Sequence, residues 1–350
     1  MNPTLLTWKH VIRVCLLLAG VLLLLSFVGL IVGPASMPVR EIVGPALWEA
    51  LTGSPSTVTA KILSYRLPRV LLAMIVGAAL GVAGAGYQAL LRNPLADPYV
   101  LGVSSGAALG AILSLALAAR LTLATPLAAF VGAALAITVV YYLGQRGREL
   151  APYTLLLAGI IMASFLSGII VFLLYFLTGR DLRGFIFWLM GDLSNPPALL
   201  YLLWLGLATL AAIGVIYFVA GDLNLLLGGE PEAEALGVNV RRTKLLVYLA
   251  ASLATALAVS VSGAIGYVGL LVPHLVRLLF GSDYRLLVPA SALAGAVVLV
   301  AADALARTVV APTELPVGAV TAVVGAPVFI YLLRFRLGGR LRPPGAGGGR

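Results

Sequence analysis

Arginines near the ends of apolar segments are the side chains of this sequence best suited to binding chemistry. Arg66 and Arg69 lie at the start of the apolar segment 68–91, and Arg307 precedes the last apolar segment, followed by Glu314. A guanidinium group forms two parallel hydrogen bonds with a carboxylate. These arginines could therefore pair with acidic residues of a partner protein, or they could anchor helix ends at lipid phosphates.

Asp303 is the carboxylate that falls within a predicted membrane-spanning segment. A carboxylate there is costly and is often functional, for example in a proton relay. Asp303 lies near one end of its segment and four residues before Arg307, which is the spacing of neighbours on one helix face. We therefore expect a local ion pair between these two residues rather than a relay.

The sequence shows no histidine or cysteine pattern of a catalytic or metal site. His10 and His274 are its only histidines, and Cys15 is its only cysteine. The H-E-x-x-H and C-x-x-C patterns are missing, and so is the phosphate-binding pattern G-x-x-x-x-G-K-[ST]. We expect that this chain is not an enzyme and binds no cofactor. Any ATP and Mg²⁺ that drive it must be held by a separate subunit.

The polar segment 220–243 contains the signature of a short helix. Pro231 suits its first turn, the neighbouring glutamates suit its positive N-terminal end, and Gly237 suits the position after its last turn. The segment could be a solvated loop helix, or it could be a rigid contact through which a cytoplasmic partner moves this chain.

Small residues recur at spacings that allow close packing of helices. Gly77 and Gly81 are four residues apart, and such a pair lets two helix backbones approach each other in lipid. Small residues in the segment 154–177 could form a packing seam or the wall of a wide conduit. They are Gly159, Ala163, Ser164, Ser167 and Gly168.

The composition predicts a helical membrane protein. Of the 350 residues, 61% are hydrophobic and 10% are charged, whereas soluble domains carry roughly 25% charged residues. The mean hydropathy is +1.08. A spanning helix needs about 20 apolar residues, and the apolar runs are long and continuous. We predict an all-α polytopic fold in one transmembrane domain, residues 1–350. Its ten spans are placed at 11–33, 68–91, 99–119, 124–143, 154–177, 198–219, 244–262, 266–280, 285–303 and 316–334.

The distribution of charge predicts the orientation in the membrane. The net charge is +10, and an even number of spans places both termini on one side. The basic termini put that side in the cytoplasm, so the charge indicates orientation rather than nucleic-acid binding. The apolar run in 11–33 exceeds the core of a signal peptide, about 7–15 residues, and is predicted to be a span. We expect an outer loop at 34–65 and a disordered tail at 338–350.

Motifs spread over about residues 60–335 resemble the permease subunits of bacterial ABC importers for iron-siderophores, haem and cobalamin. Each motif is short, and their common order along the chain makes the resemblance specific. The matching motifs are Arg66-Leu67-Pro68-Arg69, Gln88 with Asn93-Pro94-Leu95-Ala96-Asp97-Pro98, Leu101-Gly102-Val103-Ser104-Ser105-Gly106-Ala107, Leu155-Leu156-Leu157-Ala158-Gly159, Trp188-Leu189-Met190-Gly191, Ala235-Leu236-Gly237, Gly263-Ala264-Ile265-Gly266-Tyr267-Val268-Gly269-Leu270-Leu271-Val272-Pro273-His274, Glu314-Leu315-Pro316-Val317-Gly318 and Gly325-Ala326-Pro327.

The resemblance implies a type II ABC importer permease in the bacterial or archaeal inner membrane. It implies a homodimer with the pathway at its axis, lined largely by the fifth and tenth spans. Two ATP-binding subunits and a periplasmic or lipid-anchored substrate-binding protein would complete the importer. The implied residues are Arg66, Arg69 and Arg307 for docking of the binding protein; Asn93, Pro94, Leu95, Pro152 and Tyr153 for the cytoplasmic gate; Glu230, Glu232, Ala233, Ala235, Leu236 and Gly237 for ATPase coupling; and Gly159, Ser164, Ser167 and Gly168 for the pathway.

The predicted function is therefore ATP-driven import of a metal chelate. An iron-siderophore or haem is the first expectation for the cargo, with cobalamin next. An ion-driven secondary transporter is the alternative, and it would need carboxylates near the membrane midplane. An intramembrane enzyme is a third hypothesis, and it would need a nucleophile or a metal cluster.

Overall fold

The structure is a computed structural model that describes residues 7–35, 45–53, 55–117, 124–147, 149–176, 179–332 and 334. The predicted tail, 338–350, lies outside these residues, as do most of the predicted loop before residue 45 and the basic residues Arg40, Arg120 and Arg148.

Each of the ten predicted spans corresponds to a helix, and the all-α prediction is confirmed. These helices are α1 (Trp8–Ile31), α4 (Val58–Leu90), α5 (Val103–Ala116), α6 (Ala124–Leu143), α7 (Pro152–Leu174), α9 (Leu199–Phe218), α12 (Val240–Ser262), α13 (Val268–Phe280), α14 (Tyr284–Ala306) and α15 (Val317–Leu332). Among the described residues, seven of them are long and apolar enough to cross a membrane, and α5, α13 and α15 are shorter.

Short elements connect the ten helices. They are α3 (Pro45–Thr52), η1 (Pro98–Leu101), the two-residue strands β1 (Gln145–Arg146) and β2 (Glu149–Leu150), α8 (Gly179–Leu189), α10 (Ala220–Leu226) and α11 (Glu230–Ala235). The strands pair antiparallel, with Gln145 opposite Leu150. Helix α8 follows the fifth span, and the short helix predicted in the segment 220–243 is α11.

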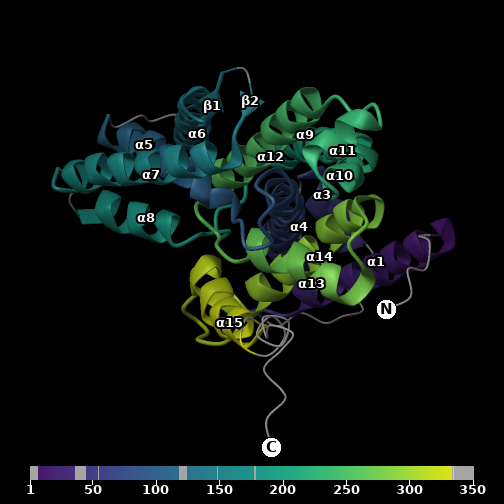
Figure 1. Ribbon diagram of the computed structural model, residues 1–350. Helices are drawn as coiled ribbons and strands as arrows, with labels where there is room; N and C mark the ends of the chain where they lie inside the picture. Colours follow the sequence, from purple (N-terminus) through teal and green to yellow (C-terminus); the bar gives the residue numbers. More distant parts are fainter. Residues whose placement is uncertain are drawn as a thin grey trace, which may run out of the picture.

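Helix α4 lies at the centre of the bundle, with α12, α13 and α14 around it (Figure 1). In its most apolar window 78% of the residues are buried inside the subunit, against 17% for the peripheral helix α1. The α4–α14 contact depends on the predicted glycine pair. A Cβ atom on Gly77 would overlap the carbonyl of Gly295, and one on Gly81 would overlap that of Ser291. The expected close backbone approach is confirmed.

The prediction of a loop over 34–65 is wrong for residues 45–52 and 58–65. These residues form α3 and the first turns of α4, which begins at Val58 rather than at residue 68. The Thr57 hydroxyl caps this start by accepting a hydrogen bond from the Ala60 N–H at 3.1 Å. Ala46 of α3 packs with Ala60 and Leu63 of α4 in a small separate core, and this burial stabilises the helical extension.

The chain between α12 and α13 is not helical, although it lies within the bundle. Gly263 and Tyr267 both have left-handed backbones, with φ 65° and 68°. The Tyr99 hydroxyl donates a hydrogen bond to the Ile265 carbonyl at 3.1 Å and accepts one from the Ile265 N–H at 3.0 Å. Irregular backbone inside a membrane bundle requires such partners, so Tyr99 stabilises the break.

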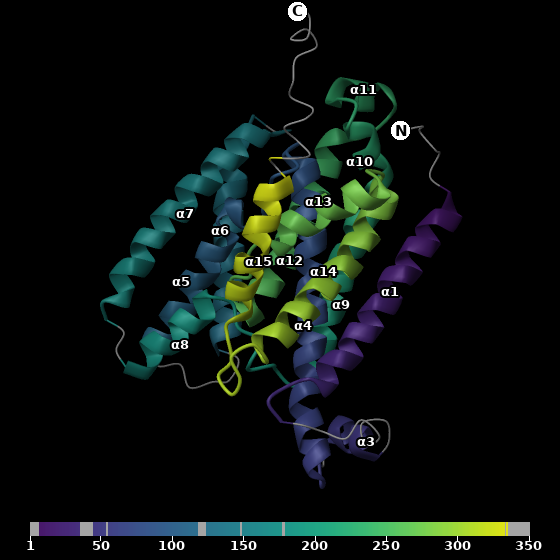
Figure 2. The same cartoon turned by 90° about the horizontal axis from the view of Figure 1, so that it is seen from below.

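The bundle has two distinct ends (Figure 2). Helices α3 and α8 and the start of α4 lie at one end. Helices α10 and α11 lie at the other, together with the start of α1 and the end of α15. We name these the outer end and the inner end, following the orientation expected from charge. The first and last of the ten helices thus begin and end on the same side, as an even number of spans requires.

Candidate functional site

The turn after α4 forms part of the inner end. Arg92 has a left-handed backbone, with φ 50°, which ends the helix and redirects the chain toward η1. The Asn93 side chain accepts a hydrogen bond from the Leu95 N–H at 2.9 Å, and such bonds fix a turn locally. Asn93, Pro94 and Leu95, the residues of the predicted gate, are all exposed. They are therefore accessible at the inner end of the subunit.

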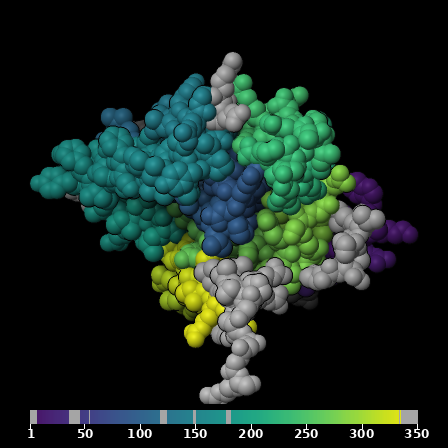
Figure 3. All heavy atoms as spheres, viewed as in Figure 1, coloured from purple at the N-terminus to yellow at the C-terminus, as the bar shows by residue number. Residues whose placement is uncertain are grey.

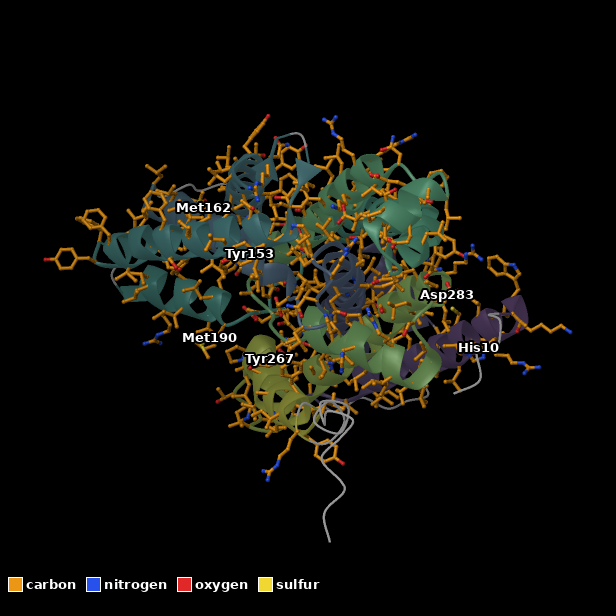
Figure 4. The ribbon with its side chains drawn as sticks, viewed as in Figure 1. His10, Tyr153, Met162, Met190, Tyr267 and Asp283 are labelled. Carbon is orange, nitrogen blue, oxygen red and sulfur yellow. The ribbon has the colours of Figure 1, made fainter. Side chains whose placement is uncertain are left out.

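The second predicted constriction lies at the start of α7, also at the inner end (Figure 2). The hairpin of β1 and β2 leads into it. Pro152 occupies the first turn of α7, where its missing N–H leaves no hydrogen bond unmade. The Tyr153 side chain is 79% exposed, and Figure 4 shows where it lies on α7.

Helix α11 has the local structure that the sequence predicts. Pro231 lies in its first turn, Glu230 and Glu232 lie at its N-terminal end, and Gly237 follows its last turn with φ 89°. Ala233 is fully buried, and packs with Val238 and Val240. Of the residues predicted to contact the ATPase, Glu232, Ala235, Leu236 and Gly237 are exposed.

The Glu230 carboxylate points toward its own subunit. It forms ion pairs with Arg92, in the turn after α4, and with Lys244, near the start of α12. Sequence reasoning placed Glu230 at the contact with the ATPase and missed both pairs. Thr243 of α12 likewise donates a hydrogen bond to Asp222 of α10 at 2.9 Å. The segment 220–243 is thus joined to the bundle through polar contacts.

The inner face shows how these segments meet. Figure 3 views this face and shows the blue residues at the end of α4 between the teal residues of α7 and the green residues of α10 and α11. The structure therefore brings the two predicted gate segments and the predicted coupling segment to one surface.

At the outer end, Arg69, Asp303 and Arg307 form a buried ion cluster. The Arg69 Nε donates to Asp303 Oδ1 at 2.8 Å, and the Arg307 Nε lies 3.0 Å from Asp303 Oδ2. The Arg69 Nη1 also reaches Glu314 Oε2 at 2.6 Å. The first three side chains are at most 2% exposed, whereas that of Glu314 is 31% exposed. The predicted Asp303–Arg307 pair is confirmed, and Arg69 shares its carboxylate.

Further donors of the outer arginines also bind this chain. Arg66 and Arg307 donate hydrogen bonds to carbonyl oxygens of residues 29–35, at and beyond the end of α1. Arg66, Arg69 and Arg307 are all buried, so the docking role predicted for them would require a partner to displace a contact within this subunit. They join α1 to α4 and α14. Withdrawing one of them to bind another protein would leave a buried group unpaired.

The residues predicted to line the pathway divide into two groups on α7. Ser164, Ser167 and Gly168 are exposed. Gly159 is buried, and a Cβ atom there would collide with the Val100 carbonyl of η1. The prediction for Gly159 is therefore corrected: its small size allows α7 to pack against η1, and it does not line an open surface.

Two residues of the family motifs, Met190 and Tyr267, make packing contacts that the sequence analysis did not anticipate. Figure 4 shows Met190, at the end of α8, and Tyr267, in the break before α13, near α15. The Gly318 N–H of α15 donates to the Gly191 carbonyl at 3.3 Å, and Gly325 of α15 lies against the Tyr267 ring. The left-handed backbone of Tyr267 is the feature that directs this ring. No sequence pattern predicts it for a tyrosine.

Among the residues described by the structure, no group of three or more His, Cys, Asp and Glu side chains could hold a metal ion. Charged clusters instead lie at the two ends of the bundle, and exposed apolar side chains cover α7 and α15 between them. A bundle of apolar helices with charge confined to its ends is typical of a protein that spans a membrane.

The chain belongs to the FecCD transport family, whose model matches residues 16–335. It is 44% identical over 303 residues to the cobalamin import system permease protein BtuC of Halobacterium salinarum, covering 83% of this chain and 80% of that protein. It is 42% identical over 325 residues to the hemin transport system permease protein HmuU of Yersinia pestis, covering 91% and 95%. Each of the two matches extends over more than four fifths of this chain.

A solved inward-facing structure of a metal-chelate type ABC transporter has the same fold. Its TM-score is 0.79 at 30% sequence identity, and the match covers 93% of this chain and 99% of that one. Family and fold together show that this chain is the membrane-spanning permease of an ABC transporter and not itself an enzyme. Such a permease works with ATPase and substrate-binding partners.

Proposed function

We propose that this chain imports a metal chelate, either an iron-siderophore, haem or cobalamin, through a pathway at the axis of a homodimer. The observation that carries the proposal is the exposed, largely apolar surface of α7 and α15. Val323 and Val324 of α15 are exposed, as are Ser164, Ser167 and Gly168 of α7. Apolar walls with few small polar groups bind a large solute weakly, so it can pass without being held. The relatives named for cobalamin and hemin support this class of cargo.

We propose the following assembly around that pathway. Two copies of this chain pair in the cytoplasmic membrane, with both termini in the cytoplasm. Two ATP-binding subunits contact the exposed residues of α11, and a periplasmic or lipid-anchored protein delivers the cargo at the outer end. ATP and Mg²⁺ are held by the ATP-binding subunits, and this chain holds no cofactor. The excess of Arg and Lys at the inner end supports this orientation.

Two inner segments would act as the gate: the turn Asn93–Leu95 and the start of α7 at Pro152 and Tyr153. The exposure of Asn93, Pro94, Leu95 and Tyr153 supports this role. At the outer end, the binding protein would dock around Glu314, the half-exposed member of the arginine cluster. One carboxylate of the binding protein would replace Glu314 as the partner of Arg69. The buried Arg66 and Arg307 would stabilise this end through their hydrogen bonds to carbonyls of residues 29–35.

The docking proposal is tested by capture of the binding protein on membranes that contain the permease. Glu314→Ala frees one side of Arg69 and should preserve or strengthen capture, whereas Arg69→Gln should weaken it. Loss of capture in Glu314→Ala, with normal thermal stability, would refute the exchange of carboxylates.

Uptake into vesicles tests the function. The permease is purified with the ATPase and the binding protein encoded beside it, and reconstituted with radiolabelled cobalamin, haem or an iron-siderophore outside. Concentrative uptake should require ATP and both partners. Uptake by the lone permease under a proton or sodium gradient would instead show a secondary transporter. The pairing of Asp303 with two arginines already argues against that alternative, since a proton carrier needs a carboxylate that can be released.

A further inference from the structure

One carboxylate at the inner end contacts two cations from different parts of the fold. Glu230, the first residue of α11, lies 2.5 Å from Lys244 Nζ through Oε2 and 3.1 Å from Arg92 Nη2 through Oε1. The two oxygens thus have separate partners. Lys244 belongs to α12, and Arg92 belongs to the turn after α4. We call these three residues the Glu230 node.

The cations of the node are attached to the two predicted gate segments. Arg92 directly precedes Asn93, and its left-handed backbone starts the turn. The Lys244 ammonium donates a second hydrogen bond, 3.4 Å long, to the carbonyl of Leu150. Leu150 lies two residues before Pro152. The node therefore connects α11 to both segments, which are far apart in the sequence.

The two ion pairs differ in burial. The Lys244 side chain is 9% exposed and that of Arg92 is 45% exposed, with Glu230 between them at 28%. A buried ammonium requires its counter-charge, because an unpaired buried charge is strongly unfavourable. The Lys244 pair should hold throughout a movement. The more exposed Arg92 pair is weaker, and it can lengthen or break while Glu230 stays bound to Lys244.

A small cavity beside the Glu230 node leaves room for movement of the Arg92 side chain. A water-sized cavity lies beside Arg92 and Lys244 and is otherwise lined by apolar side chains of α4, α10 and α12, including Leu90 and Leu223. A small free space therefore lies between the end of α4, α10 and α12, next to the Arg92 side chain.

We propose that Glu230 is a positioning residue that transmits a displacement of α11 to both inner gate segments, through Arg92 to the turn at Asn93 and through Lys244 to the start of α7. This inference rests on the proposed function, because it takes α11 as the contact with the ATPase and these segments as the gate. The Glu230 node is the physical connection between α11 and the two gate segments.

The first test uses the permease alone, in lipid nanodiscs, with amide hydrogen exchange as the readout. Glu230→Gln keeps the shape of the side chain and removes its charge. Exchange in peptides covering 91–97 and 150–153 should both become faster, by about fivefold or more. Glu234→Gln, the same change at an exposed position of α11, is the matched control and should alter neither segment. Unchanged exchange in either segment, or equal acceleration in the control, would overturn the proposal.

The second test uses the permease with its bound ATPase. Cys15→Ser removes the only cysteine, and Leu95→Cys places a thiol in the exposed part of the turn. The ratio of maleimide labelling rates with and without ATP reports nucleotide-driven movement. Glu230→Gln and Arg92→Gln should bring this ratio close to one, and Arg92→Lys should retain it. A purely structural role would change both rates together and keep the ratio, which would overturn the proposal.

The two tests separate failure of this inference from failure of the proposed function. If no ATPase co-purifies with the unaltered permease, the proposed function is in error, and hydrogen exchange still decides whether the node connects the three segments. If the ATPase binds and the Glu230→Gln ratio is unaltered, the node does not transmit movement, although the assembly is as proposed.

Discussion

Removing the Asp303 carboxylate should destabilise the subunit more than almost any other single change at its outer end. Asp303 accepts from Arg69 through one oxygen and lies 3.0 Å from Arg307 through the other. In Asp303→Leu, Arg69 keeps Glu314 as a partner. Arg307 keeps only neutral partners, the backbone carbonyls of Gly29, Val32 and residue 303. One buried guanidinium is thus left without a counter-charge.

The expected cost follows from the burial of the cluster. Breaking a buried ion pair by removing one partner costs about 3–5 kcal/mol, because the remaining charge is uncompensated. Glu314→Gln removes a half-exposed partner and leaves Asp303 in place, so its cost should be about 1 kcal/mol or less. The double variant Asp303→Leu with Arg307→Met removes both members of one pair. It should be less destabilised than Asp303→Leu alone.

Equilibrium unfolding in mixed micelles measures these differences. The purified subunit is titrated with sodium dodecyl sulfate, and helix content is followed by circular dichroism for the three variants above, for Arg307→Met alone and for the unaltered chain. The reasoning is refuted if Asp303→Leu costs no more than Glu314→Gln. It is also refuted if the double variant costs the sum of its two single changes, because the residues would then be energetically independent.

Three further predictions use the same unfolding assay. Gly84→Ala would drive a Cβ atom into a carbonyl of α13 and should cost about 1–3 kcal/mol; Gly20→Ala, with open space around it, is its control and should cost nothing measurable. Tyr99→Phe leaves the Ile265 N–H unpaired, which should cost about 1–3 kcal/mol and speed exchange of that amide; a protected amide would contradict it. Burial raises the pKa of the Asp97 carboxyl in the folded subunit. The free energy of unfolding should therefore rise as the pH falls through this raised pKa. Asp97→Asn should remove this rise, and an unchanged pH profile would show that another group is responsible.

The helices were predictable because their signal is local. A run of about 20 apolar residues determines a span, and Pro231 with Gly237 marks the two ends of α11 without reference to the rest of the fold. The Asp303–Arg307 pair was predictable for the same reason, since the two residues are one helical turn apart.

Contacts between distant segments were not predictable from one sequence. Arg69 is 234 positions from Asp303, and no local pattern shows that it shares this carboxylate instead of facing solvent. The role of Gly159 could not be predicted either, because a small residue on a helix is compatible with both a packing seam and the wall of a conduit. Only the position of η1 decides between them. Helix α3 was missed for a different reason. It has only eight residues, and packing against α4 stabilises it, which the sequence of the segment alone does not show.

The two ends of the subunit use the same ion-pair chemistry with opposite consequences. In the outer cluster, Arg69, Asp303 and Arg307 are nearly inaccessible, so separating them would expose unpaired charge to a medium that cannot solvate it. That cluster should hold α4 and α14 as one rigid unit. In the Glu230 node, Arg92 remains accessible to water, and water can replace a partner at little cost. Burial, rather than the number of ion pairs, therefore determines which end of the bundle is rigid and which can move.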